Sequence, residues 1–536
     1  MKTSNKLQII QIHCMDNPDL VLRCVKSILQ NILSYSYIPM YRGEEVGYAS
    51  SEFPIVVINL IDDENLDDSC EVASIARHSE KYLSELWAGV DSASFIRDKI
   101  HFIYTPKNST YYKDLVTEEI KKHSTLEPAV YDYFCLNSRK RGSQNFGNLF
   151  ALAICNTFGF HPSQASVMHL DMDEMFKSLV KYRIDGKTYY QMEPGPNYIG
   201  ITKKFLDMGY KVLGRKYTGN SASPINMVKE LFVTLEYALP ESVSNYKSTK
   251  PHRSFFVLED DSLESFKYKF VEPDELWHYI PQIIRSYKNR TPITNLRDLD
   301  WYNDRDFSLD DSTPPTQKTF RLDIVRNAFD PIKGGIHDVF NYFVLKGVLK
   351  GERVFCRIPP TLHLRKNGPG QNFQGEGLFD SIDPDMITDT YEVLLFDEKQ
   401  LDDRLLQDIV LNTKKAMVDF NTDSLFSRFY DIIEIHSRLQ SKLSNLDMYK
   451  KIDDIESKYF GKVNSAQWCA QSKTLDAISS VVAEFNDFKN TIATKLYRED
   501  PVDFESGNWI KEYFEQLHDW GVLCDIFSRI ELRKQL

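Results

Sequence analysis

The chain has no excess of positive charge, no regular cysteine framework and no long apolar run. Its formal net charge is −12, which argues against a general affinity for nucleic acid or anionic membranes. Its eight cysteines include no Cys-x-x-Cys pair, so neither structural zinc nor a disulfide scaffold is expected. No stretch approaches roughly 18 uninterrupted apolar residues, and the N-terminus lacks the apolar core of a signal peptide. We therefore expect a cytoplasmic protein without a transmembrane segment.

What the chain does have is length and aromatic side chains. It holds 536 residues, of which 42% are hydrophobic and 13% aromatic. That composition is typical of a soluble globular protein. A chain of this length exceeds what one hydrophobic core usually organises, so about two to three domains are expected.

Strand and helix signals alternate along the first 180 residues. Short apolar runs fit buried strands at residues 7–13, 53–61, 99–104 and 167–170. Between them, apolar positions three and four residues apart predict helices at residues 20–33, 70–87 and 145–157. Alternation of this kind predicts an α/β fold with a mainly parallel sheet.

Two aspartates, Asp171 and Asp173, close the fourth apolar run, in the sequence Ser-Val-Met-His-Leu-Asp-Met-Asp-Glu. Ligands of open α/β folds bind at the carboxyl ends of the strands, which is where these carboxylates fall. Carboxylate oxygens suit Mg²⁺ or Mn²⁺ that is also held by a substrate's phosphates. The simpler alternative is a helix cap after a strand. Because Asp-x-Asp is a short motif, its place among neighbouring segments carries the argument.

Five segments in a fixed order resemble the inverting, GT-A-fold glycosyltransferases of the large family 2 type. The most specific after the aspartate pair is the stretch Gly-Gly-Ile-His-Asp followed, at the family's spacing, by Pro-Pro-x-Leu-His-x-Arg. In this stretch a histidine, His337, stands where the family usually carries glutamate. The five segments lie at residues 12–28, 58–69, 144–151, 171–173 and 332–365.

The resemblance implies a role for each candidate residue. The metal, Mn²⁺ or Mg²⁺, would be held by Asp171, Asp173 and His363, and Asp338, beside His337, would be the general base. The donor nucleotide sugar would be bound by Asp16, Asp62, Asp63, Arg141, Asn145, Asp171 and Arg365. Other roles stay open for several of these: a solvated acidic turn for Asp62 and Asp63, an N-cap for Asn145, a solvated basic loop for Arg141 and a structural histidine for His363.

The resemblance and the residue pattern along the chain together predict a domain plan, in which the insertion and the helical region have no counterpart in the family. Residues 1–180 would form the nucleotide-sugar-binding half of a Rossmann-like GT-A domain, and residues 319–395 its C-terminal part with the catalytic helix and a Gly-rich lid loop at 367–377. Residues 181–318 would be an insertion carrying the acceptor region, with a linker-like stretch at 310–318. Residues 396–536 would be an α-helical domain, and a homo-oligomer could form through it.

The expected function is metal-dependent transfer of a hexose or N-acetylhexosamine from a nucleotide diphosphate, UDP by family frequency, to a hydroxyl on a glycan, protein or small molecule. Two alternatives stay open. A nucleotidyltransferase would use a related sheet, but it normally has a glycine-rich basic loop after the first strand, and residues 14–20 contain neither glycine nor lysine. A non-catalytic glycan-binding or scaffold protein would use the acidic residues only as caps.

Overall fold

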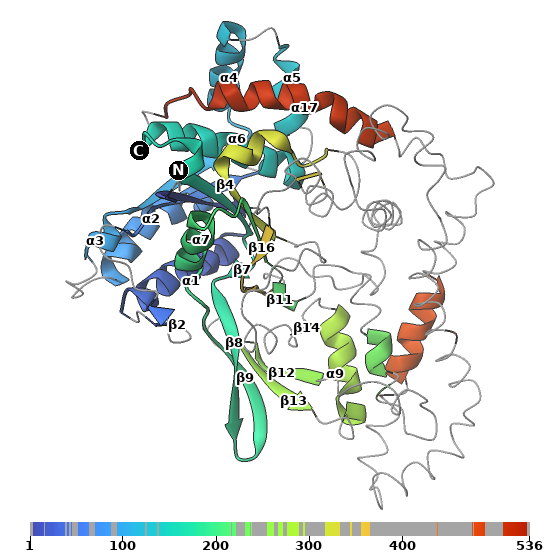
Figure 1. Cartoon of the computed structure of the whole chain (residues 1–536). Coiled ribbons are helices and arrows are strands. Elements are labelled where there is room, and N and C mark those ends of the chain that lie inside the picture. Colours follow the sequence, from blue (N-terminus) through green and yellow to red (C-terminus); the bar gives the residue numbers. More distant parts are fainter. Residues whose placement is uncertain are drawn as a thin grey trace, which may run out of the picture.

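The computed structural model shows an α/β protein built around a seven-stranded sheet (Figure 1). The structure describes residues 4–14, 17–37, 40–41, 44–45, 52–63, 70–86, 94–123, 126–136, 139–215, 217–220, 231–235, 237, 255–261, 266–271, 276–288, 293–294, 317–332, 344–345, 355–364, 437, 474, 476–487 and 508–532.

Strands and helices alternate through the first half of the described chain, as the apolar runs predicted. The main sheet is formed by β1 (Leu7–Cys14), β4 (Ile55–Asp62), β5 (Ile100–Pro106), β6 (Ala165–Asp171), β10 (Val212–Arg215), β15 (Gln317–Arg321) and β16 (Phe355–Arg357). The helices are α1 (Pro18–Tyr37), α2 (Glu71–Leu86), α3 (Ser94–Arg97), α4 (Thr110–His123), α5 (Ala129–Tyr131), α6 (Arg139–Thr157), α7 (Tyr198–Asp207), α9 (Leu276–Lys288) and α17 (Asn508–Phe527).

The strand order of the main sheet is β16-β10-β15-β6-β1-β4-β5. Strands β6, β1, β4 and β5 are parallel, and β15 is antiparallel to both of its neighbours. The sheet is therefore mixed, with a parallel centre, which confirms the predicted α/β class and is compatible with a Rossmann-like domain. After β5 the chain returns to the other side of β1 to form β6, so the strand order reverses beside β1.

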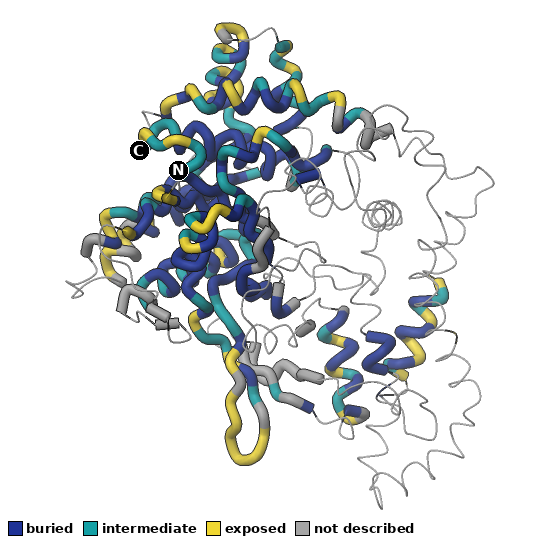
Figure 2. Tube along the Cα trace, viewed as in Figure 1, coloured by how far each residue is buried: buried dark blue, intermediate teal, exposed yellow. Residues whose placement is uncertain are grey.

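Helices cover both faces of the sheet, because alternate residues of its central strands are apolar on both sides. Ile10 and Ile12 of β1 face α1 and α2, whereas Leu7 and Ile9 belong to the core formed with α4 and α6. Figure 2 shows this buried layer in the upper left part of the molecule.

The C-terminal helix α17 belongs to the same core. Figure 1 shows that it lies across α6 and α4, two helices that are far from it in the sequence. Trp520 is fully buried there, and its indole Nε1 donates to the carbonyl of Val325 at 2.9 Å. After the C-terminal end of the helix, the amide of Leu532 donates to Thr157 Oγ1 at 2.9 Å. The end of the chain thus completes one face of the sheet domain.

Two smaller four-stranded sheets accompany the main one. The first has the order β14-β11-β17-β7 and contains β7 (Glu174–Met175), β11 (Tyr217–Asn220), β14 (Ile293–Thr294) and β17 (Thr361–His363). The second has the order β12-β13-β9-β8 and contains β8 (Lys177–Ile184), β9 (Lys187–Pro194), β12 (Phe255–Asp261) and β13 (Phe266–Val271). The β8–β9 hairpin extends away from the main sheet (Figure 1). The remaining short elements are the strands β2 (Met40–Tyr41) and β3 (Glu44–Glu45), the π-helical turn Asp132–Leu136 and the 3₁₀ turns Pro162–Gln164 and Leu322–Asn327.

No helix among the described residues is long and apolar enough to cross a membrane.

Candidate functional site

The candidate site lies at the carboxyl ends of β1 and β6. These strands are neighbours, and the register pairs His13 with Asp171. The strand order reverses here, which is where open α/β sheets bind ligands. The chain runs from Asp171 through a tight turn into β7, and β17 pairs with β7 so that His363 faces Glu174. Segments far apart in sequence therefore meet at one edge.

Asp173 and His363, two of the predicted metal ligands, are in direct contact. Nε2 of His363 lies 3.2 Å from Oδ2 of Asp173, with side chains 1% and 14% exposed. The backbone supports the same approach, because the amide of Leu364 donates to the carbonyl of Asp173 at 3.0 Å. The third predicted ligand, Asp171, lies at the other end of the same turn.

The spacing of this pair fits shared ligation of a divalent ion. Ligands about 2.1 Å from an octahedral ion, and at right angles to one another, are about 3.0 Å apart. The 3.2 Å between His363 and Asp173 is close to that value. Carboxylate and imidazole are also a donor set that Mn²⁺ accepts. Within the described part of the chain, no group of three or more His, Cys, Asp or Glu side chains is arranged as a metal site, so Asp171 is not brought together with the other two predicted ligands.

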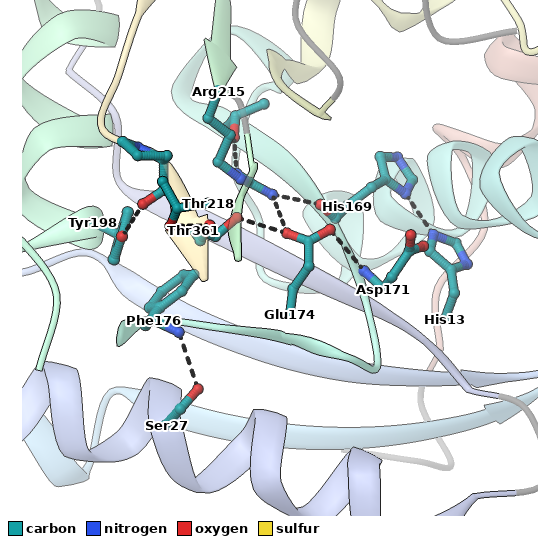
Figure 3. Close-up of polar contacts among 12 residues, drawn as sticks. His13, Ser27, His169, Asp171, Glu174, Phe176, Tyr198, Arg215, Thr218 and Thr361 are labelled. Atoms are coloured by element: carbon teal, nitrogen blue, oxygen red, sulfur yellow. Dashed lines mark hydrogen bonds and ion pairs between the residues drawn. The ribbon is translucent and has the colours of Figure 1, made fainter. Parts of the chain in front are cut away.

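A buried ion pair lies directly behind the turn (Figure 3). Glu174 and Arg215 are both fully buried, with Arg215 Nη2 3.7 Å from Glu174 Oε2. The same Glu174 oxygen accepts a hydrogen bond from Thr361 Oγ1 at 2.9 Å, and Oε1 accepts one from the amide of Asp171 at 3.2 Å. Arg215 also donates to the carbonyl of His169 at 2.6 Å. The carboxylate of Glu174 in β7 thus contacts residues of three other strands, β6, β10 and β17.

Burial dominates the electrostatics of Glu174. The pKa of its carboxyl is raised to about 7 on balance: loss of solvent raises it most, the Arg215 charge lowers it, the Asp171 charge raises it and His363 lowers it. A buried carboxylate costs several kcal/mol in desolvation unless charge and hydrogen bonds compensate it. Arg215 and the Thr361 hydroxyl supply that compensation.

Two histidines that the motif reasoning missed lie beside the turn. The rings of His13 and His169 are stacked, with centroids 5.1 Å apart, and His13 Nε2 is 2.9 Å from His169 Nδ1. His169 Nε2 in turn lies 2.8 Å from Asn148 Oδ1 on α6. The signal was present in the sequence, because each histidine interrupts an apolar strand near its carboxyl end.

The acidic end of β4 is built into the protein. Asp62 is 1% exposed and accepts a hydrogen bond from the Tyr104 hydroxyl at 3.0 Å. Burial raises the pKa of Tyr104, with the Cys70 and Asp62 contacts adding to the effect, so the hydroxyl stays a donor. Asp63 lies 3.4 Å from Lys107 Nζ and accepts a hydrogen bond from Ser143. These partners hold the strand end together.

The helix predicted to begin at Asn145 in fact begins at Arg139. Arginine and lysine are good helix formers, so the basic cluster extends the helix although it adds nothing to the apolar pattern. Asn145 is consequently not an N-cap. Its Nδ2 donates to the carbonyls of Phe134 and Asp330, at 3.1 and 2.8 Å, and its Oδ1 accepts from the amide of Asp330 at 2.6 Å. Arg141 Nη1 donates to the carbonyl of Ile332 at 2.8 Å.

Gly147 is a point of close approach between α6 and the sheet. A Cβ at this position would lie 2.9 Å from Ile61 Cδ1 and 3.2 Å from His169 Cε1. His169 has little room to move, because His13 and Asn148 hold its ring nitrogens.

Gly147→Ala should therefore destabilise the protein by about 1 kcal/mol, since overpacking costs roughly 1–3 kcal/mol and helix propensity returns about 1 kcal/mol. The matched control is Gly521→Ala in α17, whose Cβ would meet only the end of Arg326, at 3.8 Å. That substitution should stabilise by about 0.5–1 kcal/mol. Thermal unfolding of both variants checks the opposite signs, and a stabilised Gly147→Ala variant would contradict the close packing.

Several predicted residues cannot be compared with the structure. Asp16, His337, Asp338, Arg365 and the Gly-rich loop at 367–377 lie outside the described residues. The sequence has a second acidic strand end at residues 259–261. It belongs to β12, at the edge of the sheet that contains the β8–β9 hairpin, and not to the main sheet.

Comparison with protein-family models and with curated proteins finds no match to this chain. The functional argument therefore rests on the sequence motifs and on the geometry of the site.

Proposed function

We propose that the protein is a metal-dependent glycosyltransferase that uses a nucleotide diphosphate sugar, with UDP as the favoured nucleotide. The observation that carries the proposal is the contact between Asp173 and His363 at the carboxyl ends of β1 and β6. Motifs far apart in the sequence predict these two residues as metal ligands, and the residues meet at the edge where open α/β sheets usually bind ligands. The GT-A character of the sheet domain is part of this proposal.

The chain's own residues would divide the work as follows. Asp171, Asp173 and His363 would hold Mn²⁺ or Mg²⁺ against the donor diphosphate, and the ion would offset the negative charge that develops on the departing diphosphate. Asp338 is the general base that the family resemblance implies, taking the proton of the acceptor hydroxyl. The insertion and the C-terminal region would supply the acceptor site.

The carboxylates of Asp62 and Asp63 already have partners within the protein, and this bears on how the nucleotide base would bind. Uracil offers an imide N–H, which needs an acceptor. Asp62 accepts from Tyr104, and Asp63 accepts from Ser143 and lies beside Lys107. A base at this strand end would have to share one of these acceptors. A measurable preference for UDP over CDP, whose cytosine N3 carries no proton, would support such sharing.

Wild-type protein should be stabilised by UDP and Mn²⁺ added together, and much less by either alone. A ligand at about 100 times its Kd stabilises the folded state by about 2.7 kcal/mol, which is readily seen in a thermal shift.

A screen of UDP-, GDP- and CDP-sugars in Mn²⁺ or EDTA would identify the donor by nucleotide release. Pyrophosphate release from a nucleoside triphosphate and a sugar phosphate would instead indicate a nucleotidyltransferase. If the protein bound none of these nucleotides, the remaining alternative would be a non-catalytic glycan-binding or scaffold protein.

A further inference from the structure

The carboxylate of Glu174 connects the two chain segments that carry the proposed metal ligands. Glu174 follows Asp173 directly, and one of its oxygens accepts from the backbone amide of Asp171, so it spans the turn that holds both aspartates. Its other oxygen accepts from Thr361, which lies two residues before His363. Residues two apart in a strand point to the same face, so Thr361 and His363 approach the turn side by side.

Arg215 fixes this connection to the main sheet. Its guanidinium lies 3.7 Å from Glu174, donates to the carbonyl of His169 in β6 at 2.6 Å and donates to Thr319 Oγ1 in β15 at 3.2 Å. Neither Arg215 nor Glu174 is exposed to solvent. Two buried, oppositely charged groups with this many partners have few alternative positions. Figure 3 shows Arg215, Thr361 and Asp171 converging on Glu174.

We propose that Glu174, with Arg215 and Thr361, is a positioning residue that holds Asp171 and Asp173 in register with His363. This inference rests on the proposed metal-dependent function, which it deepens. Glu174 itself contacts the Asp171 amide in the turn and the Thr361 side chain in β17. The metal would be bound by the side chains of Asp171, Asp173 and His363. Groups that orient metal ligands from behind typically contribute about 10–100-fold to metal affinity.

Thr361→Val is the sharpest test, because it removes only the hydroxyl and keeps the shape of the side chain. Thr361→Ser restores the hydroxyl and should recover wild-type behaviour. Thr157→Val is the matched control: its hydroxyl also bonds the backbone, accepting from Leu532 and donating to Ala153 at 2.8 Å, but it lies at the far end of α6. Two quantities are measured: Mn²⁺ affinity by electron paramagnetic resonance, with and without UDP, and amide exchange without metal.

Thr361→Val should weaken Mn²⁺ binding by about 10–100-fold. It should also speed hydrogen exchange of two amides by about tenfold or more. These are the Asp171 amide, which donates to Glu174 Oε1, and the Leu364 amide, which donates to the carbonyl of Asp173. Thr361→Ser and Thr157→Val should match wild type in both quantities. Unchanged affinity and unchanged exchange in Thr361→Val would overturn the inference. If wild type binds no Mn²⁺, the proposed function falls, and exchange alone then decides whether Glu174 and Thr361 hold the turn.

Discussion

Asp173→Ala should reduce sugar transfer by about 10³-fold or more and remove Mn²⁺ binding, with little change in stability. The side chain lies 3.2 Å from His363 and is 14% exposed. Loss of an ion that stabilises a leaving diphosphate removes several kcal/mol of transition-state stabilisation, and about 4 kcal/mol corresponds to 10³-fold in rate. Because the carboxylate is not part of the apolar core, removing it should leave the fold intact.

The control for this variant is Asp525→Ala on α17. Asp525 is also an aspartate paired with a cation, at 3.5 Å from Arg326, but its side chain is 53% exposed. Exposed pairs of this kind contribute about 0–1 kcal/mol to stability, and Asp525 has no contact with the candidate site among the described interactions. Its activity and Mn²⁺ affinity should equal those of wild type. Full transfer activity in Asp173→Ala would refute the assigned metal ligand.

Trp520→Ala should destabilise the sheet domain by about 3–5 kcal/mol, the usual cost of truncating a large buried aromatic side chain. The indole is 0% exposed, with its ring centroid 5.4 Å from that of Phe134 and 5.8 Å from that of Phe329. It also donates to the carbonyl of Val325. The loss should appear in the slowest-exchanging amides of β1, which would exchange faster by roughly two to three and a half powers of ten.

His518 provides the comparison, because it lies two residues away on the same helix and is exposed. His518→Ala should change stability by no more than about 0.5 kcal/mol. If Trp520→Ala left exchange in β1 unchanged, α17 would be a removable attachment to the sheet domain.

The central strands could be predicted from the sequence because each is an apolar run with clear ends. The runs at residues 7–13 and 53–61 became β1 and β4 with ends shifted by only one or two positions. The start of α6 was missed because its first turn is basic, and a hydrophobic pattern says nothing about polar helix formers. The packing of α17 on α6 was also out of reach, because it depends on tertiary contacts between segments far apart in the chain.

The candidate site divides in the same way. Asp171, Asp173 and His363 could be chosen because each lies in a short motif with a characteristic spacing. Arg215 has no such motif: it ends a short apolar run and is followed by Lys216 in the sequence, and only the fold brings it to Glu174. Glu174 offered one usable signal, since a third acidic residue directly before apolar Met175 and Phe176 has to be compensated when the turn is buried.

Calorimetric titration of UDP into wild-type protein, in Mn²⁺ and in EDTA, tests the central claim most directly. The account predicts that UDP binds with Mn²⁺, that binding weakens by at least about tenfold in EDTA, and that Asp173→Ala binds no better with Mn²⁺ than without it. Equal UDP affinity of the wild type in Mn²⁺ and in EDTA would contradict a metal–diphosphate site at Asp173 and His363.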